Sequence, residues 1–180
     1  ISIVKNNPFR LADDIWGIGF KTADKIAQQL GFDKNSFERC RSGIKYVLNE
    51  LSNDGHCYAV REQLVKEAME MLELDEGLIN STIDRMIEEK SIITDEENSI
   101  YLPTFYFSET GVVKRIKEIL YQQVSMQIID IERIISEIQQ EHDISYDQVQ
   151  LDAIRAAAIS KFMVLTGGPG TGKTTTTLAI

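Results

Sequence analysis

The sequence feature that most constrains the fold is a glycine-rich run near the end of the chain. Residues 167–174 read Gly-Gly-Pro-Gly-Thr-Gly-Lys-Thr and match the pattern G-x-x-x-x-G-K-[S/T] at every position. This pattern holds phosphate groups where a strand leads into it and a helix leads out of it. The short apolar run 162–165 therefore predicts a buried parallel strand, and 175–180 predicts the opening of a helix.

The run also predicts a nucleotide site. Its glycines let successive backbone N–H groups point into one concavity that can hold phosphate oxygens, at the positive end of the following helix. Lys173 can place a cation on the β- and γ-phosphates, and the hydroxyl of Thr174 can ligate Mg²⁺, so these two residues are the predicted catalytic pair and Thr174 the predicted metal ligand. A glycine-rich turn without a ligand is the alternative. The predicted nucleotide-binding residues of the run are Gly167, Gly168, Pro169, Gly170, Thr171, Gly172, Lys173, Thr174 and Thr175.

A glutamine upstream of the run bears on which nucleotide would bind. Gln150 lies 17 positions before Gly167, on a helix predicted from Ser145 to about Ser160. Its side-chain amide offers one donor and one acceptor face to an adenine edge, which favours ATP over GTP. A surface glutamine beside Gln148 is the alternative. The predicted cofactors are ATP and Mg²⁺.

The opening 34 residues predict a helix-hairpin-helix. Asn7 before Pro8 is typical of a helix start, with asparagine as the cap and proline in the first turn. Gly17 and Gly19 do not both fit within one helix, so the first helix ends there. Apolar residues then recur at spacings of three and four up to the stop at Gly31, which predicts a second helix.

The Gly-Ile-Gly hairpin is a candidate DNA contact. Its two glycines expose backbone N–H groups at the N-terminus of the second helix, where one phosphate of a nucleic-acid backbone could bind. A compact corner that only packs is the alternative, and Asp24 and the pair Asp13-Asp14 mildly favour it. The predicted DNA-binding residues are Gly17, Ile18, Gly19, Lys21, Thr22 and Lys25.

Residues 35–108 predict a winged-helix-like module. Apolar stripes indicate helices over 37–53, from Arg61 and from Glu76, and two β-prone runs, 91–94 and 99–102, predict a hairpin. Its third helix and hairpin tip are rich in carboxylates, which a DNA backbone would repel. We therefore expect this module to act as a spacer or a protein-contact surface.

The rest of the chain predicts connecting helices over 109–143 and the start of a RecA-like ATPase lobe over 144–180. The predicted fold class is mainly α, with a small β-hairpin, followed by the first strand and phosphate loop of a truncated α/β domain. Such a strand lacks sheet neighbours here, so we expect the tail 162–180 to be mobile or to pair with another chain.

Charge and composition exclude several classes of protein. The formal net charge is −9, which argues against a surface that binds polyanions throughout; only 1–34 is net positive, at +1, against −8 for 35–108 and −2 for 109–180. No apolar run is long enough to cross a bilayer, and no N-terminal stretch combines a basic start, an apolar run and a small-residue cleavage site, so we expect neither a membrane nor a secreted protein. Cys40 and Cys57 indicate reduced thiols in a cytoplasmic protein, and we expect no metal site from His56 and Cys57.

Two stretches together resemble one known family. Asn7-Pro8-Phe9-Arg10-Leu11, followed by residues 15–24 (Ile-Trp-Gly-Ile-Gly-Phe-Lys-Thr-Ala-Asp), resembles the helix-hairpin-helix region of RecD-like DNA helicases, in the long form named exodeoxyribonuclease V alpha chain, of superfamily 1. Residues 165–175 (Leu-Thr-Gly-Gly-Pro-Gly-Thr-Gly-Lys-Thr-Thr) resemble the nucleotide-binding motif of that family. Residues 150–154 (Gln-Leu-Asp-Ala-Ile) are similar to its upstream glutamine motif, which strengthens the adenine role of Gln150.

The resemblance implies an ATP-dependent helicase of DNA repair and recombination. Such an enzyme moves 5′→3′ on single-stranded DNA and opens tailed duplexes by closing and opening a cleft between two RecA-like lobes. The chain lacks the acidic Mg²⁺-binding motif, the arginine fingers and the second lobe, and it begins without a methionine, so we expect a fragment that does not hydrolyse ATP by itself. A non-enzymatic DNA-binding or assembly module, or another P-loop ATPase such as an AAA+ loader, is the alternative.

Overall fold

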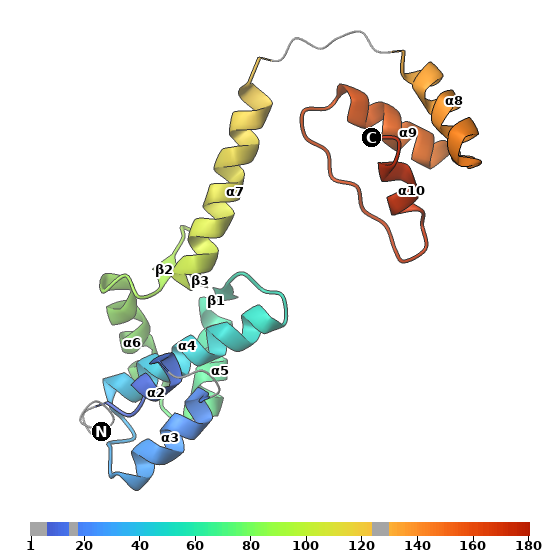
Figure 1. The fold of residues 1–180 in the computed structure, drawn as a ribbon. Coiled ribbons are helices and arrows are strands. Elements are labelled where there is room, and N and C mark those ends of the chain that lie inside the picture. Colours follow the sequence, from blue (N-terminus) through green and yellow to red (C-terminus); the bar gives the residue numbers. More distant parts are fainter. Residues whose placement is uncertain (1–6, 15–17, 124–129) are drawn as a thin grey trace. The chain divides into compact units, whose positions relative to one another are not determined.

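The computed structural model describes residues 7–14, 18–123 and 130–180 (Figure 1). The chain divides into two compact units, 1–110 and 111–180, which are described separately below. Within the described residues no helix combines the length and the apolar character that a membrane span needs.

In the part of the first unit that the structure describes, five helices precede α7 (Pro103–Tyr121). The first two are α2 (Arg10–Asp14) and α3 (Phe20–Gln29), followed by α4 (Phe37–Asn53), α5 (Arg61–Leu72) and α6 (Glu76–Glu88). The side chain of Asn7 accepts a hydrogen bond from the N–H of Phe9 (3.1 Å), so it caps the turn that leads into α2. Ser36 and Asp75 cap α4 and α6 by accepting from backbone N–H groups three residues later. The helices predicted over 37–53, from Arg61 and from Glu76 are confirmed.

A small antiparallel sheet completes the first unit. Its strands are β1 (Ala59–Val60), β2 (Ile93–Thr94) and β3 (Ser99–Tyr101), in the order β1-β3-β2, with Ala59 opposite Ile100 and Ile93 opposite Tyr101. The predicted hairpin corresponds to β2 and β3, whereas β1 was not predicted. The chain order α4-β1-α5-α6-β2-β3 is that of a winged-helix module.

The hairpin tip is ordered by one carboxylate. Asp95 accepts hydrogen bonds from the N–H groups of Ser99 (2.9 Å) and Glu97 (3.0 Å) and from the hydroxyl of Tyr101 (3.2 Å). These bonds hold the pKa of Asp95 below its ordinary value, and burial together with the Asp95 charge raises the pKa of Tyr101 to about 12. At least one of the three acids at the tip therefore serves the turn itself.

One hydrophobic core joins the helix-hairpin-helix to the three-helix module. Phe9 and Phe20 stack with ring centroids 6.2 Å apart, and Phe20 also contacts Tyr46 of α4. Sequence segments 1–34 and 35–108 therefore fold as a single packed body. The buried residues of this core are Phe9, Phe20, Ala27, Cys40, Ile44, Val47, Leu48, Ala59, Leu64, Val65, Ala68, Leu72, Leu74, Ile79, Ile83, Met86, Ile92 and Ile100.

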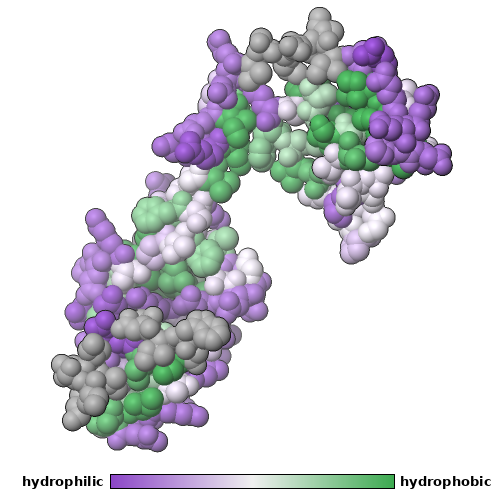
Figure 2. Space-filling model, in the orientation of Figure 1, coloured by the Kyte–Doolittle hydropathy of each residue, from purple (hydrophilic) through white to green (hydrophobic). Residues whose placement is uncertain are grey.

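A long helix, α7 (Pro103–Tyr121), crosses the boundary between the two units. It begins six residues before the start expected at Glu109, because Pro103, two residues after the end of β3, fits the first position of a helix. None of its described side chains is buried, and apolar side chains are visible along it in Figure 2. The most exposed are Phe107, Val112, Val113, Ile119, Leu120 and Tyr121.

Over the described residues 130–180, the second unit forms α8 (Ile131–His142), α9 (Gln148–Ile159) and α10 (Lys173–Thr177). Asp130 caps α8 by accepting from the N–H of Arg133, as its position predicted. Ile135 of α8 and Ile154 of α9 are buried together with Tyr146 and Ala179 in one small core. Residues 173–180 of the expected free tail thus pack against α9.

The prediction of a buried strand over 162–165 is wrong. Residues 160–172 form neither helix nor strand, and Phe162 and Val164 are 43% and 68% exposed. A single extended segment gains no ladder hydrogen bonds without a neighbouring strand, and the described residues of this unit supply none. The phosphate loop is therefore reached through irregular backbone.

Candidate nucleotide-binding loop and DNA-contacting hairpin

Two glycines shape the phosphate loop. Gly170 and Gly172 have φ angles of +78° and +73°, a conformation that glycine adopts without strain. Gly172 is the N-cap of α10, so the loop ends and the helix begins at Lys173. Thr171 closes the turn, because its hydroxyl donates to the carbonyl oxygen of Gly168 (2.9 Å). The fold of the loop thus follows from the glycine spacing.

The ammonium group of Lys173 points back over this loop. Its Nζ donates to the carbonyl oxygens of Gly167 (2.6 Å) and Gly168 (2.7 Å). A phosphate oxygen accepts the same kind of hydrogen bond and carries more charge, so it can replace either carbonyl as the partner. Thr174 is exposed at the first turn of α10, and its hydroxyl can reach solvent or a bound cation.

The predicted adenine contact, Gln150, lies beside the loop. A Cβ added at Gly172 would overlap the side-chain amide of Gln150, so these two residues are in direct contact. Gln150 also completes a capping box: its Oε1 accepts from the N–H of Asp147 (3.0 Å), and Asp147 accepts from the N–H of Gln150 (2.9 Å). The structure thus brings Gln150 to the site and gives its oxygen a structural partner.

The loop is anchored at its far side by residues that the sequence reasoning did not single out. The hydroxyl of Tyr146 donates to the carbonyl oxygen of Thr175 (3.2 Å). Thr176 is buried, and its hydroxyl and N–H both donate to the carbonyl oxygen of Gly172 (3.0 and 2.8 Å). The spacing Asp147-x-x-Gln150 was a readable signal for the cap, whereas no local pattern marks Tyr146.

These residues fit a nucleotide phosphate better than a metal ion held by protein alone. The loop offers backbone N–H groups and one ammonium, which are donors for an anion. In the described ranges no group of three or more His, Cys, Asp or Glu side chains is placed to hold a metal. Thr174 alone would leave Mg²⁺ dependent on phosphate oxygens and water, as is common for this ion.

The second candidate site is the hairpin, of which the structure describes Ile18 and Gly19; Gly17 lies outside the described residues. Gly19 is the N-cap of α3 in an extended conformation, without a side-chain cap and with open space where a Cβ would stand. The first N–H groups of α3 have no partner within the helix. The predicted contacts Lys21, Thr22 and Lys25 are all exposed in the first two turns of α3.

Asp24 does not oppose this site in the way that its charge suggested. Its side chain is buried and accepts from Nε and Nη2 of Arg39 (2.7 and 3.1 Å). Arg39 donates further to the backbone carbonyls of Lys34 and Leu72 (both 3.0 Å). The carboxylate is therefore neutralised inside the unit, and the exposed face of α3 is more positive than the sequence indicated.

Fold and site together define a class: a helix-hairpin-helix unit joined to the beginning of a P-loop ATPase. Comparison with known proteins agrees. Residues 1–58 match the family model "ATP-dependent RecD2 DNA helicase HHH domain", and residues 150–180 match the model of an AAA domain. Along 93% of its length the chain is 24% identical to the ATP-dependent RecD2 DNA helicase of Deinococcus radiodurans, of which it covers 25%.

These matches confirm the resemblance to RecD-like DNA helicases. The similarity covers a helix-hairpin-helix domain at residues 1–58 and the start of an AAA domain at residues 150–180. It spans about a quarter of the length of the relative that it matches.

Proposed function

We propose that the chain forms part of a cytoplasmic, ATP-dependent DNA helicase that moves 5′→3′ on single-stranded DNA. One observation carries the proposal: a complete phosphate loop, with Lys173 turned over it and Gln150 against it, occurs in one chain with a RecD2-type helix-hairpin-helix domain. An AAA+ loader or a non-enzymatic module is not favoured, because the similarity to a helicase extends along nearly the whole chain.

In this function the residues of the loop bind and orient ATP. The backbone N–H groups of Gly168 and of residues 170–173 would hold phosphate oxygens, Lys173 would neutralise charge on the β- and γ-phosphates, and Thr174 would ligate Mg²⁺. Mg²⁺, when bound, would stabilise the negative charge that develops on the phosphate oxygens during phosphoryl transfer. The hairpin residues Gly19 to Lys25 would hold one backbone phosphate of the DNA without reading its sequence.

Polarity of unwinding tests the proposal. In the full-length helicase we expect ATP-dependent opening of a duplex with a 5′ single-stranded tail and no opening of a duplex with a 3′ tail. The release of a fluorescently labelled strand measures the opening. ATP consumption without unwinding from either tail would instead assign the protein to the loader or remodelling class.

A single substitution can separate the two roles of Gln150. Gln150→Glu keeps an oxygen that accepts from the N–H of Asp147, but it removes the amide donor that an adenine edge requires. We expect the KM for ATP of the full-length helicase to rise about tenfold or more, since the acceptor atom on the adenine edge would lose its hydrogen-bond donor. Thermal unfolding followed by circular dichroism should be unchanged.

The matched control for that experiment is Gln148→Glu, two residues earlier in the first turn of α9. Its amide bonds only Asp152 on the helix surface (2.8 Å). An equal rise in KM for both variants would show that negative charge near the loop, and not the lost donor, causes the effect.

A further inference from the structure

A second basic site lies in the first unit, in a cleft between the start of α2 and one face of α4. The cleft has a volume of about 290 Å³. It is lined on one side by Phe9 and Arg10 and on the other by Glu38, Arg41, Ser42 and Lys45. The α4 residues recur at spacings of three and four, so the helix presents them on one face.

The charges of this cleft favour an anion. Among its described lining residues, α4 contributes two cations, Arg41 and Lys45, against one acid, Glu38. Arg41 also lies 3.3 Å from Glu89, but that carboxylate accepts a shorter bond from Arg85 (2.9 Å). One carboxylate shared by two guanidinium groups leaves a positive excess.

Aromatic packing connects the cleft to the hairpin. Phe9 lines the cleft, and its ring stacks on that of Phe20, the first residue of α3. Phe20 contacts Tyr46, and the ammonium of Lys21 lies 5.7 Å from the centroid of the Tyr46 ring. The cleft and Lys21 therefore border one cluster of rings.

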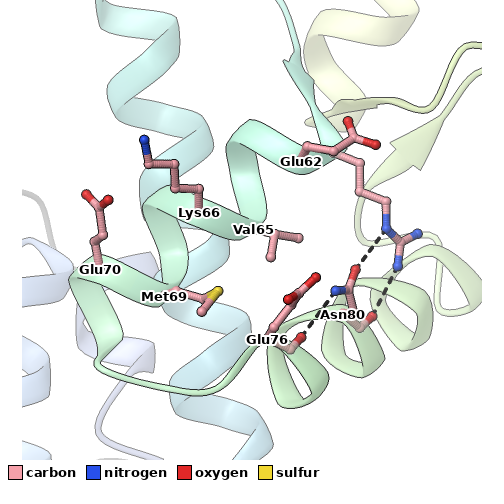
Figure 3. A pocket seen from close by; sticks show the side chains of 8 residues that line it. Glu62, Val65, Lys66, Met69, Glu70, Glu76 and Asn80 are labelled. Atoms are coloured by element: carbon pink, nitrogen blue, oxygen red, sulfur yellow. Dashed lines mark hydrogen bonds between the residues drawn. The ribbon is translucent and has the colours of Figure 1, made fainter.

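The other cavity of this unit does not share these properties. It has a volume of about 440 Å³ between α5 and α6 and is lined by three glutamates, including Glu70 and Glu76 (Figure 3). Its arginine, Arg61, already donates to Asn80 and to Asp84. A phosphate would meet a net negative wall there.

We propose that the cleft between α2 and α4 binds a backbone phosphate of the single DNA strand that contacts the hairpin. This inference rests on the proposed function and adds a second contact point to it. Arg41 and Lys45 supply the charge, and Ser42, which also lines the cleft, carries a hydroxyl that can donate to a phosphate oxygen. Such contacts fix the register of a strand and do not read its sequence.

The salt dependence of DNA binding tests this inference. Binding of the 180-residue chain to a labelled oligothymidylate is followed by fluorescence anisotropy at several salt concentrations. Each phosphate contact on a single strand contributes about 0.7 to the slope of log K against log salt. Arg41→Gln/Lys45→Gln should therefore lower the slope by about 0.7 and weaken binding about tenfold at low salt. Lys66→Gln/Lys90→Gln, which removes the same charge elsewhere in the unit, should change neither quantity comparably.

The outcomes separate the inference from the proposed function. If Lys21→Gln/Lys25→Gln weakens binding but the cleft variant behaves like Lys66→Gln/Lys90→Gln, the hairpin contact stands and the cleft inference is overturned. If the unchanged chain does not bind oligothymidylate at all, the hairpin contact and the cleft inference are both overturned. If Arg41→Gln/Lys45→Gln weakens binding to duplex DNA of the same length but not to oligothymidylate, the single-strand assignment is also contradicted. Circular dichroism must show that each variant retains the helical signal of the unchanged chain.

Discussion

Lys173→Ala in the full-length helicase is expected to reduce kcat for DNA-stimulated ATP hydrolysis at least about a hundredfold, and to abolish unwinding. The ammonium group is the only cation that the loop itself can offer to the β- and γ-phosphates. Its loss also removes the two hydrogen bonds from Nζ to the carbonyl oxygens of Gly167 and Gly168. Steady-state release of inorganic phosphate measures the effect.

Lys161→Ala is the control for this substitution. Lys161 lies in the same irregular segment, but its Nζ donates to backbone carbonyls of Leu120 and Gln122 at the end of α7. This variant should hydrolyse ATP within about threefold of the unchanged enzyme, since it makes no contact with the loop. Equal losses in both variants would show that the segment fails structurally, and near-normal turnover by Lys173→Ala would refute the assigned role.

Arg39→Met is expected to destabilise the first unit by about 3–5 kcal/mol, because it leaves the buried carboxylate of Asp24 without a countercharge, with only the side-chain amide of Gln28 still donating to it. The substitution also frees the carbonyl oxygens of Lys34 and Leu72, which Arg39 now joins. Denaturant-dependent hydrogen exchange of peptides from 20–102 measures this unit without contributions from 111–180. The pair of Arg61 and Asp84 supplies the comparison: Arg61→Met leaves the carboxylate of Asp84, which is 59% exposed, in contact with water, so this variant should cost clearly less than Arg39→Met.

The double variant Asp24→Asn/Arg39→Met identifies the cause. If unpaired charge dominates, the double variant should be more stable than Arg39→Met alone. If the double variant is as unstable as the sum of the single ones, the lost backbone contacts of Arg39 dominate instead.

Local pattern was sufficient for most helices. The apolar stripes of α4, α5 and α6 gave their positions because each helix turns one face to a common core. The start of α7 was placed late, although Pro103 marks a first helical position. β1 was missed because two residues, Ala59 and Val60, are too few to show an alternating pattern.

Pairings between distant residues set the limit of prediction. The strand expected over 162–165 needs partner strands, and periodicity cannot report whether they are present. The contact between Asp24 and Arg39 joins residues 15 positions apart on different helices, so the sequence showed only an acid near a proposed DNA site.

The candidate site divides in the same way. The loop 167–174 was recognisable because the spacing of its glycines and lysine is itself what phosphate binding requires. Asp147 and Gln150 carried a readable capping signal. The cation cleft was hidden, because averaging charge over 35–108 gave −8 and obscured Arg41 and Lys45 on one helix face.

The shared core of the first unit has a mechanical consequence. Arg39 bonds α3, the segment before α4 and the end of α5, so α3 cannot swing against the other helices as a separate arm. If a DNA strand is held at the hairpin as proposed, a pull on that strand acts on helices that share one core with β3. There the ring of Tyr101 meets that of Tyr106 edge to face, in the first turns of α7. A force applied at the hairpin would therefore also act on the first turns of α7, which contact β3 through these two rings.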